Sequence, residues 1–290
     1  MVKLHKFAHF KSKEEYLNYY RLDKHISNYS FEFMEHLTDM YFVQKFCVED
    51  SRGTCILIHG YLEHSACYGP LITFLIENKM NVVTYDLHGH GLSSGRRGDI
   101  KDFRQYVAFL NQLLETYKEE NNLYLFGYST GAAIVMEYLL SLNIASIKKV
   151  ILISPFIKPS LWRVTEPLVT ISHKYISRIK RNFTKNTANV NYLRFVRNDP
   201  LQLTHIPLNW LHAAKVWHEK LSFNRQKSTQ DILIIQGMKD QTVDWRYNLP
   251  FIVSIFPNSD IILIDNGKHQ LINEEENIKE NVFYLIKQVI

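Results

Sequence analysis

The feature that most constrains the fold of this chain is a rhythm of short apolar runs separated by amphipathic segments. Buried parallel strands read as continuous apolar runs and their crossover connections read as helices, so this rhythm predicts an α/β fold with a mostly parallel central sheet flanked by helices. We expect strands at residues 55–59, 81–86, 123–127, 149–154, 231–236 and 260–264. We expect helices at residues 64–78, 101–119, 130–142, 245–256 and 274–290. Weak alternation over residues 29–48 predicts antiparallel strands at the edge of the sheet.

The rhythm stops at Pro155 and resumes only at Asp231. The intervening stretch is helix-compatible and rich in aromatic residues, and structureless loops of that length are uncommon in compact domains. We therefore expect residues 156–230 to form an inserted helical cap, with residues 1–155 and 231–290 forming the core. Such a cap would lie over the carboxyl ends of the strands, where ligands bind in open α/β sheets.

The composition, 46% hydrophobic and 22% charged, is typical of a globular protein. No apolar run approaches the roughly 20 residues of a membrane span, and the N-terminus lacks the apolar stretch of a secretory signal. The three cysteines, Cys47, Cys55 and Cys67, have no metal-ligand spacing and suit a reducing compartment. These features predict a cytoplasmic protein that needs no metal.

The net charge of +5 is concentrated in one segment. Residues 156–199 contain nine basic and only two acidic side chains, a net charge of +7, which leaves −2 for the remainder of the chain. The basicity therefore gives no reason to expect nucleic acid as a partner. It predicts instead that the cap makes a peripheral contact with an anionic membrane surface, or else that it is an ordinary solvated face. The basic residues are Lys158, Arg163, Lys174, Arg178, Lys180, Arg181, Lys185, Arg194 and Arg197.

Gly127, Tyr128, Ser129, Thr130 and Gly131 form a G-x-S-x-G turn between an apolar run and an Ala-rich segment. The order of strand, abrupt turn and helix is that of a nucleophile elbow, which holds a serine in a strained backbone conformation above the sheet. Both flanking positions must then be nearly free of side chain. Ser129 is thus the predicted nucleophile, and the helix that follows directs its N-terminal amides toward developing negative charge.

A serine hydroxyl is a poor nucleophile and needs a neighbouring base, itself oriented by an acid. Asp240 follows the strand expected at 231–236, and His269 follows the strand expected at 260–264, so both would reach the same edge of the sheet as Ser129. We therefore expect Asp240 to be the acid and His269 the base. Other aspartates near strand ends compete for the acid role: Asp244, Asp260 and Asp265.

An acyl-transfer site must also stabilise an oxyanion, typically with two backbone N–H groups. One comes from the residue after the nucleophile, here Thr130. The other is expected from the loop after an early strand, where Gly60 lets the backbone turn closely past the serine and Tyr61 offers its amide. A plain strand-ending turn at His59-Gly60 is compatible with the same role.

Two further blocks accompany the elbow in chain order: HGYLEHS at residues 59–65 and DLHGHGLS at residues 86–93. Together with the elbow they resemble the α/β-hydrolases, in particular the monoacylglycerol lipase and lysophospholipase group. Gly237-x-x-Asp240-x-x-x-Asp244 and Gly267-Lys268-His269 are also similar to that group. The resemblance covers roughly residues 54–290 and is weakest in the cap. It implies an α/β-hydrolase fold with Ser129, Asp240 and His269 as the triad and Tyr61 and Thr130 as the oxyanion amides.

The chain departs from that group at positions next to its catalytic residues. Tyr128 and Thr130 stand where histidine and methionine commonly flank the serine, and Gln270 stands where glutamate often follows the histidine. Tyr61 replaces a small residue and is expected to crowd or gate the acyl pocket. None of these departures removes a catalytic group.

These features predict a serine hydrolase that cleaves carboxylic esters and needs no cofactor. A basic, aromatic cap suits an amphiphilic ester, which favours a lysophospholipid or a monoacylglycerol as substrate. Acyl transfer to an alcohol is an alternative, because the same triad serves both reactions. An aminopeptidase is a weaker alternative, since a substrate ammonium calls for carboxylates that are scarce in the cap, and a catalytically inactive binding protein is another. Asp86, His88 and His90 resemble a metal cluster, but the interleaved glycines favour a tight structural loop.

Overall fold

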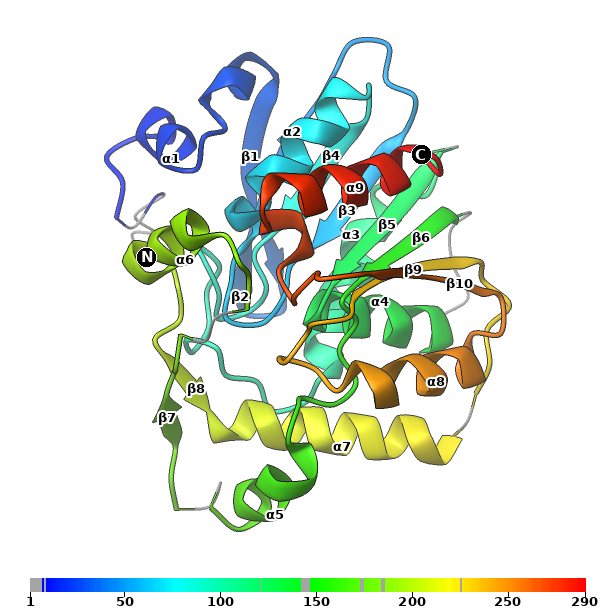
Figure 1. Cartoon of the computed structure of the whole chain (residues 1–290). Coiled ribbons are helices and arrows are strands. Elements are labelled where there is room, and N and C mark those ends of the chain that lie inside the picture. The colour runs from blue at the N-terminus through cyan, green and yellow to red at the C-terminus, as the bar shows by residue number, and fades with distance from the viewer. Residues whose placement is uncertain are drawn as a thin grey trace.

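The computed structural model describes residues 7, 9–120, 122–141, 147–172, 175–183, 186–224 and 226–290. One eight-stranded sheet runs through them in the order β1-β2-β4-β3-β5-β6-β9-β10 (Figure 1). The pairs β1–β2 and β2–β4 are antiparallel and the remaining pairs are parallel, which confirms the predicted sheet and its antiparallel edge. The strands span Tyr29–His36 (β1), Asp39–Phe46 (β2), Thr54–Ile58 (β3), Asn81–Tyr85 (β4), Leu123–Tyr128 (β5), Ile147–Ile153 (β6), Ile232–Gly237 (β9) and Ser259–Ile264 (β10).

Helices cover both faces of this sheet, as expected for crossover connections (Figure 1). The helices on one face are α3 (Arg104–Glu115), α4 (Thr130–Ser141) and α8 (Trp245–Ile255). Those on the other face are α1 (Lys13–Tyr19), α2 (Gly69–Glu77) and α9 (Glu276–Lys287).

Strand β3 shows why both faces are apolar. Ile56 and Ile58 belong to the core cluster beneath α3 and α4, whereas Cys55 and Leu57 belong to the cluster beneath α2 and α9. Successive side chains of a strand point to opposite faces, so a strand buried on both sides must be apolar throughout. The continuous apolar runs of the sequence are therefore the strands of a doubly covered sheet.

The helix expected at residues 64–78 is divided in the structure. A 3₁₀ turn, η2 (Ser65–Tyr68), precedes α2, which begins at Gly69 with Pro70 in its first turn. Proline fits the first turn of a helix but cannot donate the hydrogen bond that a helix starting earlier would need. Helix α1 was not predicted, although Ser12 accepts a hydrogen bond from the Glu15 amide and so caps it. A second 3₁₀ turn, η1 (Asp23–Asn28), connects α1 to β1.

The segment of residues 156–230, called the cap segment below, connects β6 to β9. It contains α5 (Trp162–Ser172), β7 (Arg178–Lys180), α6 (Val190–Asn198), β8 (His205–Pro207) and α7 (Leu208–Asn224). Strands β7 and β8 pair antiparallel, so the expectation of a purely helical cap was incomplete. Three-residue strands are too short to show a hydrophobic period in the sequence.

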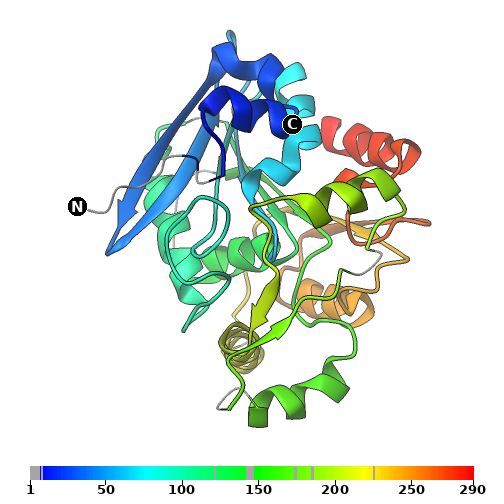
Figure 2. The same ribbon diagram turned by 90° about the vertical axis from the view of Figure 1, so that its left-hand side faces the viewer.

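The elements of the cap segment are spread over one side of the molecule. Helices α5 and α7 lie together with the β7–β8 ribbon, whereas α6 lies beside the N-terminal α1 (Figures 1 and 2). The Tyr19 hydroxyl donates to the carbonyl oxygen of Asn198 at 3.3 Å, which ties α1 to the end of α6. None of the described helices is both long and apolar enough to span a bilayer. The division of the chain into core and cap stays a prediction.

Candidate active site

The turn between β5 and α4 has the geometry of a nucleophile elbow. Ser129 has a φ of 51°, in the left-handed region that non-glycine residues seldom adopt. The flanking glycines are needed for space: a Cβ on Gly127 would lie 2.6 Å from the Cα of Ala132, and one on Gly131 would lie 2.1 Å from the carbonyl oxygen of Ile58. The small residues of the motif therefore follow from the close approach of α4 to β5 and β3.

The structure brings Ser129, His269 and Asp240 together. His269 Nε2 lies 3.1 Å from Ser129 Oγ, and His269 Nδ1 lies 2.8 Å from Asp240 Oδ2. The three side chains follow the carboxyl ends of β5, β10 and β9, and all three residues are buried. A hydroxyl, an imidazole and a carboxylate in this order form a relay in which the imidazole can accept the hydroxyl proton.

Neighbouring groups keep Asp240 charged and His269 basic. Burial alone would raise the pKa of Asp240, but the His269 ring, the Gln236 side chain and the Thr242 amide outweigh it, and the pKa is lowered. Burial alone would lower the pKa of His269, but the charge and the hydrogen bond of Asp240 outweigh it, and the pKa is raised. An imidazole that gains basicity from a buried carboxylate is suited to act as a general base.

Two hydroxyls for which no contact with His269 was predicted hold the backbone of that residue. Tyr128 and Ser154 both donate to the carbonyl oxygen of His269, at 2.6 and 2.9 Å. Tyr128 is the second residue of the elbow, so its side chain lies next to the nucleophile and reaches across to the base. Its position in the motif is the only signal in the sequence that could have suggested this role.

The proposed oxyanion donors lie in the same place. Tyr61 and Thr130 line a cavity together with Ser129, and within the described chain neither of their amides donates a hydrogen bond to a protein acceptor. Gly60 passes close to the nucleophile, since a Cβ there would lie 3.3 Å from the Cβ of Ser129. Two unsatisfied amides beside a nucleophilic hydroxyl are the arrangement that an oxyanion requires.

The competing aspartates have other roles. Asp244 caps α8 by accepting a hydrogen bond from the Tyr247 amide at 3.3 Å. Asp260 lies 3.9 Å from Lys149, and Asp265 accepts from the neighbouring amide of Asn266. Only Asp240 of these four contacts His269 in the described chain.

The cavity above Ser129 has a volume of about 220 Å³. One part of its wall is apolar and comes mainly from the cap segment, with Phe156, Leu193, Ile206, Trp210 and Leu211. The Tyr61 ring stacks on Trp210 at a centroid distance of 3.6 Å, and its hydroxyl donates to the Gly98 carbonyl at 2.8 Å. Tyr61 is therefore held at both ends as a wall of the cavity.

Another part of the wall is polar and lies next to His269. Glu63 accepts a hydrogen bond from the Tyr68 hydroxyl at 3.0 Å and one from the Gln270 side chain. Burial raises the pKa of Glu63, although Arg181 and His269 oppose the shift. Neither Gln270 nor Arg181 was predicted to line the cavity.

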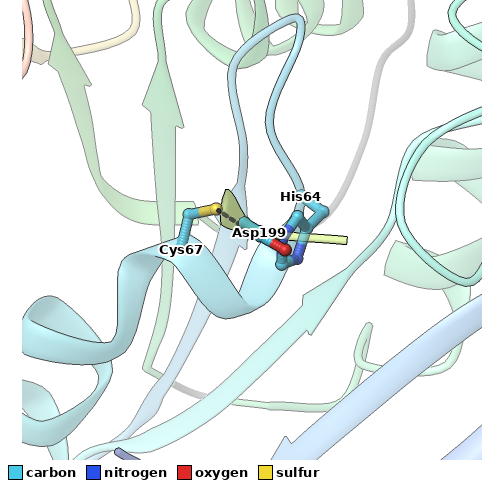
Figure 3. A group of neighbouring side chains, drawn as sticks. All are labelled: His64, Cys67 and Asp199. Carbon is cyan, nitrogen blue, oxygen red and sulfur yellow. Dashed lines mark hydrogen bonds and ion pairs between the residues drawn. The ribbon is translucent and has the colours of Figure 1, made fainter. Parts of the chain in front are cut away.

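A second cluster of polar side chains joins the core to the cap segment. His64 Nε2 lies 2.8 Å from Asp199 Oδ2, both side chains are fully buried, and Cys67 lies beside them (Figure 3). Burial alone would lower the pKa of His64, but Cys67 and Asp199 outweigh it and hold the pKa well above its ordinary value. Burial would raise the pKa of Asp199, but His64 and other donors lower it to about 2. Both shifts favour the charged forms of the pair.

Gln202 determines what this cluster can bind. Its Nε2 donates to Cys67 Sγ at 3.1 Å and to Asp199 Oδ2 at 3.2 Å, while its Oε1 accepts from Arg181 at 2.9 Å. The bond to Arg181 fixes the orientation of the amide, so an N–H group lies where a cation would contact the sulfur and the carboxylate. The cluster is an ion pair and a poor metal site.

Asp86, which resembled part of a metal-binding cluster in the sequence, has a structural role. Its carboxylate accepts from the Ser65 amide at 2.8 Å, the Ser65 hydroxyl at 2.6 Å and the Leu92 amide at 2.7 Å. A carboxylate with three donors is the anchor of a tight loop. This agrees with the structural interpretation of the HGHG stretch.

Comparison with known proteins gives a consistent family. Residues 49–276 match the family model described as serine aminopeptidase, S33. The probable lysophospholipase L2 of Haemophilus influenzae is 24% identical over 257 residues, which cover 80% of this chain and 81% of that protein. The monoglyceride lipase homolog of monkeypox virus is 25% identical over 243 residues, which cover 80% and 86%. A soluble variant of monoglyceride lipase from Saccharomyces cerevisiae, solved in complex with a substrate analog, has a TM-score of 0.79 at 21% identity and covers 89% of this chain and 93% of its own.

Proposed function

This chain belongs to the serine aminopeptidase S33 family and has the α/β-hydrolase fold that its sequence predicted, and on that premise we propose that it is a carboxylic ester hydrolase that uses Ser129, His269 and Asp240. One observation carries the proposal. The hydrogen-bonded chain from Asp240 through His269 to Ser129 lies beside two amides that have no acceptor in the described chain.

The proposed reaction follows from these positions. His269 Nε2 takes the proton of Ser129 Oγ as the oxygen attacks the ester carbonyl, and the Tyr61 and Thr130 amides hold the oxyanion. His269 then gives the proton to the departing alcohol, which leaves an acyl group on Ser129. A water molecule, activated by the same imidazole, releases the acid. Asp240 keeps the ring oriented and stabilises its charged form.

We propose a lipid amphiphile as the substrate, a lysophospholipid or a monoacylglycerol. The apolar wall of the cavity can cover an acyl chain, and its polar wall can face a head group. The names of the relatives, a probable lysophospholipase and a monoglyceride lipase homolog, support the same substrate class.

We further propose that residues 156–230 act as a cap that contacts an anionic membrane. Apolar side chains around α5 and β7 are exposed, and Arg178 and Lys180 lie among them. Apolar side chains next to basic ones favour the interface of an anionic bilayer. The exposed apolar residues are Leu161, Val164, Ile171, Tyr175, Ile176 and Ile179.

Peptide cleavage is less well supported than ester cleavage. An aminopeptidase must hold the ammonium group of its substrate, and among the described residues that line the cavity only Glu63 is acidic. Both oxygens of Glu63 already accept hydrogen bonds from the protein. The intact relay also argues against an inactive binding protein, whereas acyl transfer to an alcohol would use the same residues.

A fluorophosphonate probe tests the nucleophile, and a panel of esters tests the substrate. We expect the probe to label the protein and to fail on Ser129→Ala. Labelling that persists in Ser129→Ala, or a folded protein that is never labelled, would overturn the assignment. Hydrolysis rates should be compared for a lysophospholipid, a monoacylglycerol and p-nitrophenyl acetate, with glycerol added to detect acyl transfer. A preference for the acetyl ester would contradict the lipid assignment.

A further inference from the structure

Arg181 places a positive charge in the wall of the catalytic cavity. It follows strand β7 in the cap segment, and its side chain is partly buried. Within the described chain no carboxylate lies within 4 Å of its guanidinium. The carboxylates that act on its charge from further away are Glu63 and Asp199. Glu63 already accepts hydrogen bonds from Tyr68 and Gln270. Asp199 is already paired with His64 and accepts a hydrogen bond from Tyr20.

Only part of the guanidinium is used by the residues that the structure describes. Its Nη1 donates to the Leu62 carbonyl at 2.9 Å, the Gln202 side chain at 2.9 Å and the Leu203 carbonyl at 3.2 Å. In the described chain Nη2 and Nε donate to no protein acceptor. One face of the group stacks on Phe183 at 4.5 Å. A guanidinium held by one nitrogen and one face keeps a two-pronged edge for another anion.

The position of Arg181 relates it to the alcohol part of an ester. The leaving oxygen must lie at His269 Nε2, because that nitrogen returns the proton. Gln270 follows His269 directly and contacts Glu63, and both residues line the cavity with Arg181. The apolar wall made by Phe156 and Trp210 remains for the acyl chain.

The side chain is also held in place before any ligand arrives. Gln202 accepts from Arg181 and donates to Asp199, which is itself paired with His64. A binding group fixed by such a network loses little conformational entropy when the ligand binds.

We propose that Arg181 is the residue that binds a phosphate group on the alcohol part of the substrate, so that the cavity selects an acylglycerol phosphate over an uncharged acylglycerol. This rests on the proposed ester hydrolase function and narrows its substrate class. A planar fork of N–H donors matches two oxygens of a phosphate, and Nη2 and Nε, which donate to no acceptor in the described chain, supply that fork.

A different role for Arg181 is purely structural, because its bond to the Leu62 carbonyl also holds the loop that carries the Tyr61 amide. The two roles predict different results. Loss of a loop anchor slows the reaction with every ester and with the fluorophosphonate. Loss of a phosphate ligand slows only the reaction with phosphorylated substrates.

The experiment compares two substrates that differ only in the phosphate: 1-octanoyl-glycerol 3-phosphate and 1-octanoyl-glycerol. Arg181→Gln, Arg181→Lys and the wild type are assayed on both. Arg194→Gln is the matched control, because Arg194 is an exposed arginine of α6 and its loss changes the net charge equally. Charge-assisted hydrogen bonds of this kind correspond to about 10- to 100-fold in kcat/KM.

We expect Arg181→Gln to lose about 10- to 100-fold in kcat/KM on the phosphorylated ester and less than about threefold on the uncharged one, with the fluorophosphonate labelling rate unchanged. Arg181→Lys should retain part of the preference, since it keeps the charge without the fork. Equal losses on both esters, or no loss on either, would overturn the proposal.

Binding to a variant that cannot turn over separates this proposal from the proposed function. Calorimetric titration of 1-octanoyl-glycerol 3-phosphate into Ser129→Ala and into Ser129→Ala/Arg181→Gln measures the phosphate contact without catalysis. A tenfold or greater weakening in the double variant supports the role of Arg181 even if the wild type hydrolyses neither ester, a result that would refute only the ester hydrolase assignment. Equal affinities would refute the role of Arg181 itself.

Discussion

The carbonyl oxygen of His269 accepts hydrogen bonds from two hydroxyls and from the Leu271 amide, and this arrangement predicts an additive pair of substitutions. The donors are the Tyr128 hydroxyl at 2.6 Å, the Ser154 hydroxyl at 2.9 Å and the Leu271 amide at 3.0 Å. Tyr128→Phe or Ser154→Ala removes one hydroxyl and leaves the acceptor satisfied by the other hydroxyl and the amide. Each single substitution should therefore lower the free energy of unfolding by about 1 kcal/mol, the usual net value of one hydrogen bond.

The double variant leaves the buried carbonyl with the Leu271 amide as its donor. Because the acceptor is not orphaned, the two losses should add to about 2 kcal/mol, and the coupling energy should stay below about 0.5 kcal/mol. Phenylalanine keeps the ring contacts of Tyr128 with Tyr68 and His269, so packing contributes little to the difference. The fluorophosphonate labelling rate should fall in the same order, because the carbonyl anchors the residue that carries the catalytic ring.

Urea unfolding of the wild type, both single variants and the double variant provides the complete cycle. The slope of free energy against urea should stay unchanged, since these substitutions expose no additional surface on unfolding. A double variant that loses about 3–4 kcal/mol would refute the reasoning, because it would show that the Leu271 amide does not satisfy the carbonyl. A single variant that loses about 3 kcal/mol would refute it as well.

Two further predictions concern the catalytic acid and the surface of the cap segment. Because Asp240 raises the pKa of His269, kcat/KM of the wild type should fall as the pH drops through a value above 6.5. Asp240→Asn should shift this acidic limb of the pH-rate profile to lower pH and reduce kcat by roughly 10³–10⁴-fold. An acidic limb that does not shift would contradict the coupling between Asp240 and His269. Val164→Ser/Ile171→Ser should weaken binding to anionic vesicles, measured by co-sedimentation, by at least about tenfold without changing hydrolysis of a monomeric ester. The reason is that burying each of these exposed side chains contributes about 1.5–3 kcal/mol. Unchanged binding would exclude this face as the membrane contact.

The core of the fold could be predicted from the sequence because its strands are buried on both faces. A run such as Leu123–Tyr128 has no polar face and is uniformly buried, so neither register nor neighbouring segments had to be known to recognise it as a strand. The β7–β8 ribbon could not be found in this way. Its pairing joins Ile179 to Ile206 across a long separation, and three-residue strands carry no usable period.

The residues of the candidate site also fall into a group that the sequence could predict and a group that it could not. Ser129, Asp240 and His269 each follow the end of a predicted strand, so topology alone placed them at one edge of the sheet. Arg181 and Tyr128 could not be assigned, because their roles depend on where side chains from distant segments meet. The excess of basic residues predicted a charged outer surface for the cap segment, yet Arg181 lines the cavity instead.

The ion pair between His64 and Asp199 should make the attachment of the cap segment depend on pH in a defined window. The lowered pKa of Asp199, about 2, means that its contribution to stability is complete above 3.8 and is lost as the pH falls through about 2. The pKa of His64 is raised, so its contribution is complete below 6.5 and is lost as the pH rises through the higher value in the folded protein. The pair should therefore stabilise the protein most between about pH 4 and pH 6.5.

Asp199→Asn should lower the free energy of unfolding by about 3–5 kcal/mol within that window, because it leaves a buried imidazolium without its counter-charge. The loss should become smaller above the window, where His64 can give up its proton. Asp231→Asn, which changes an exposed carboxylate at the start of β9, is the matched control and should have little effect. Urea unfolding from pH 4.5 to pH 9 measures both variants. A loss below about 1 kcal/mol at pH 6, or a loss that does not change with pH, would show that Asp199 serves only as a hydrogen-bond acceptor.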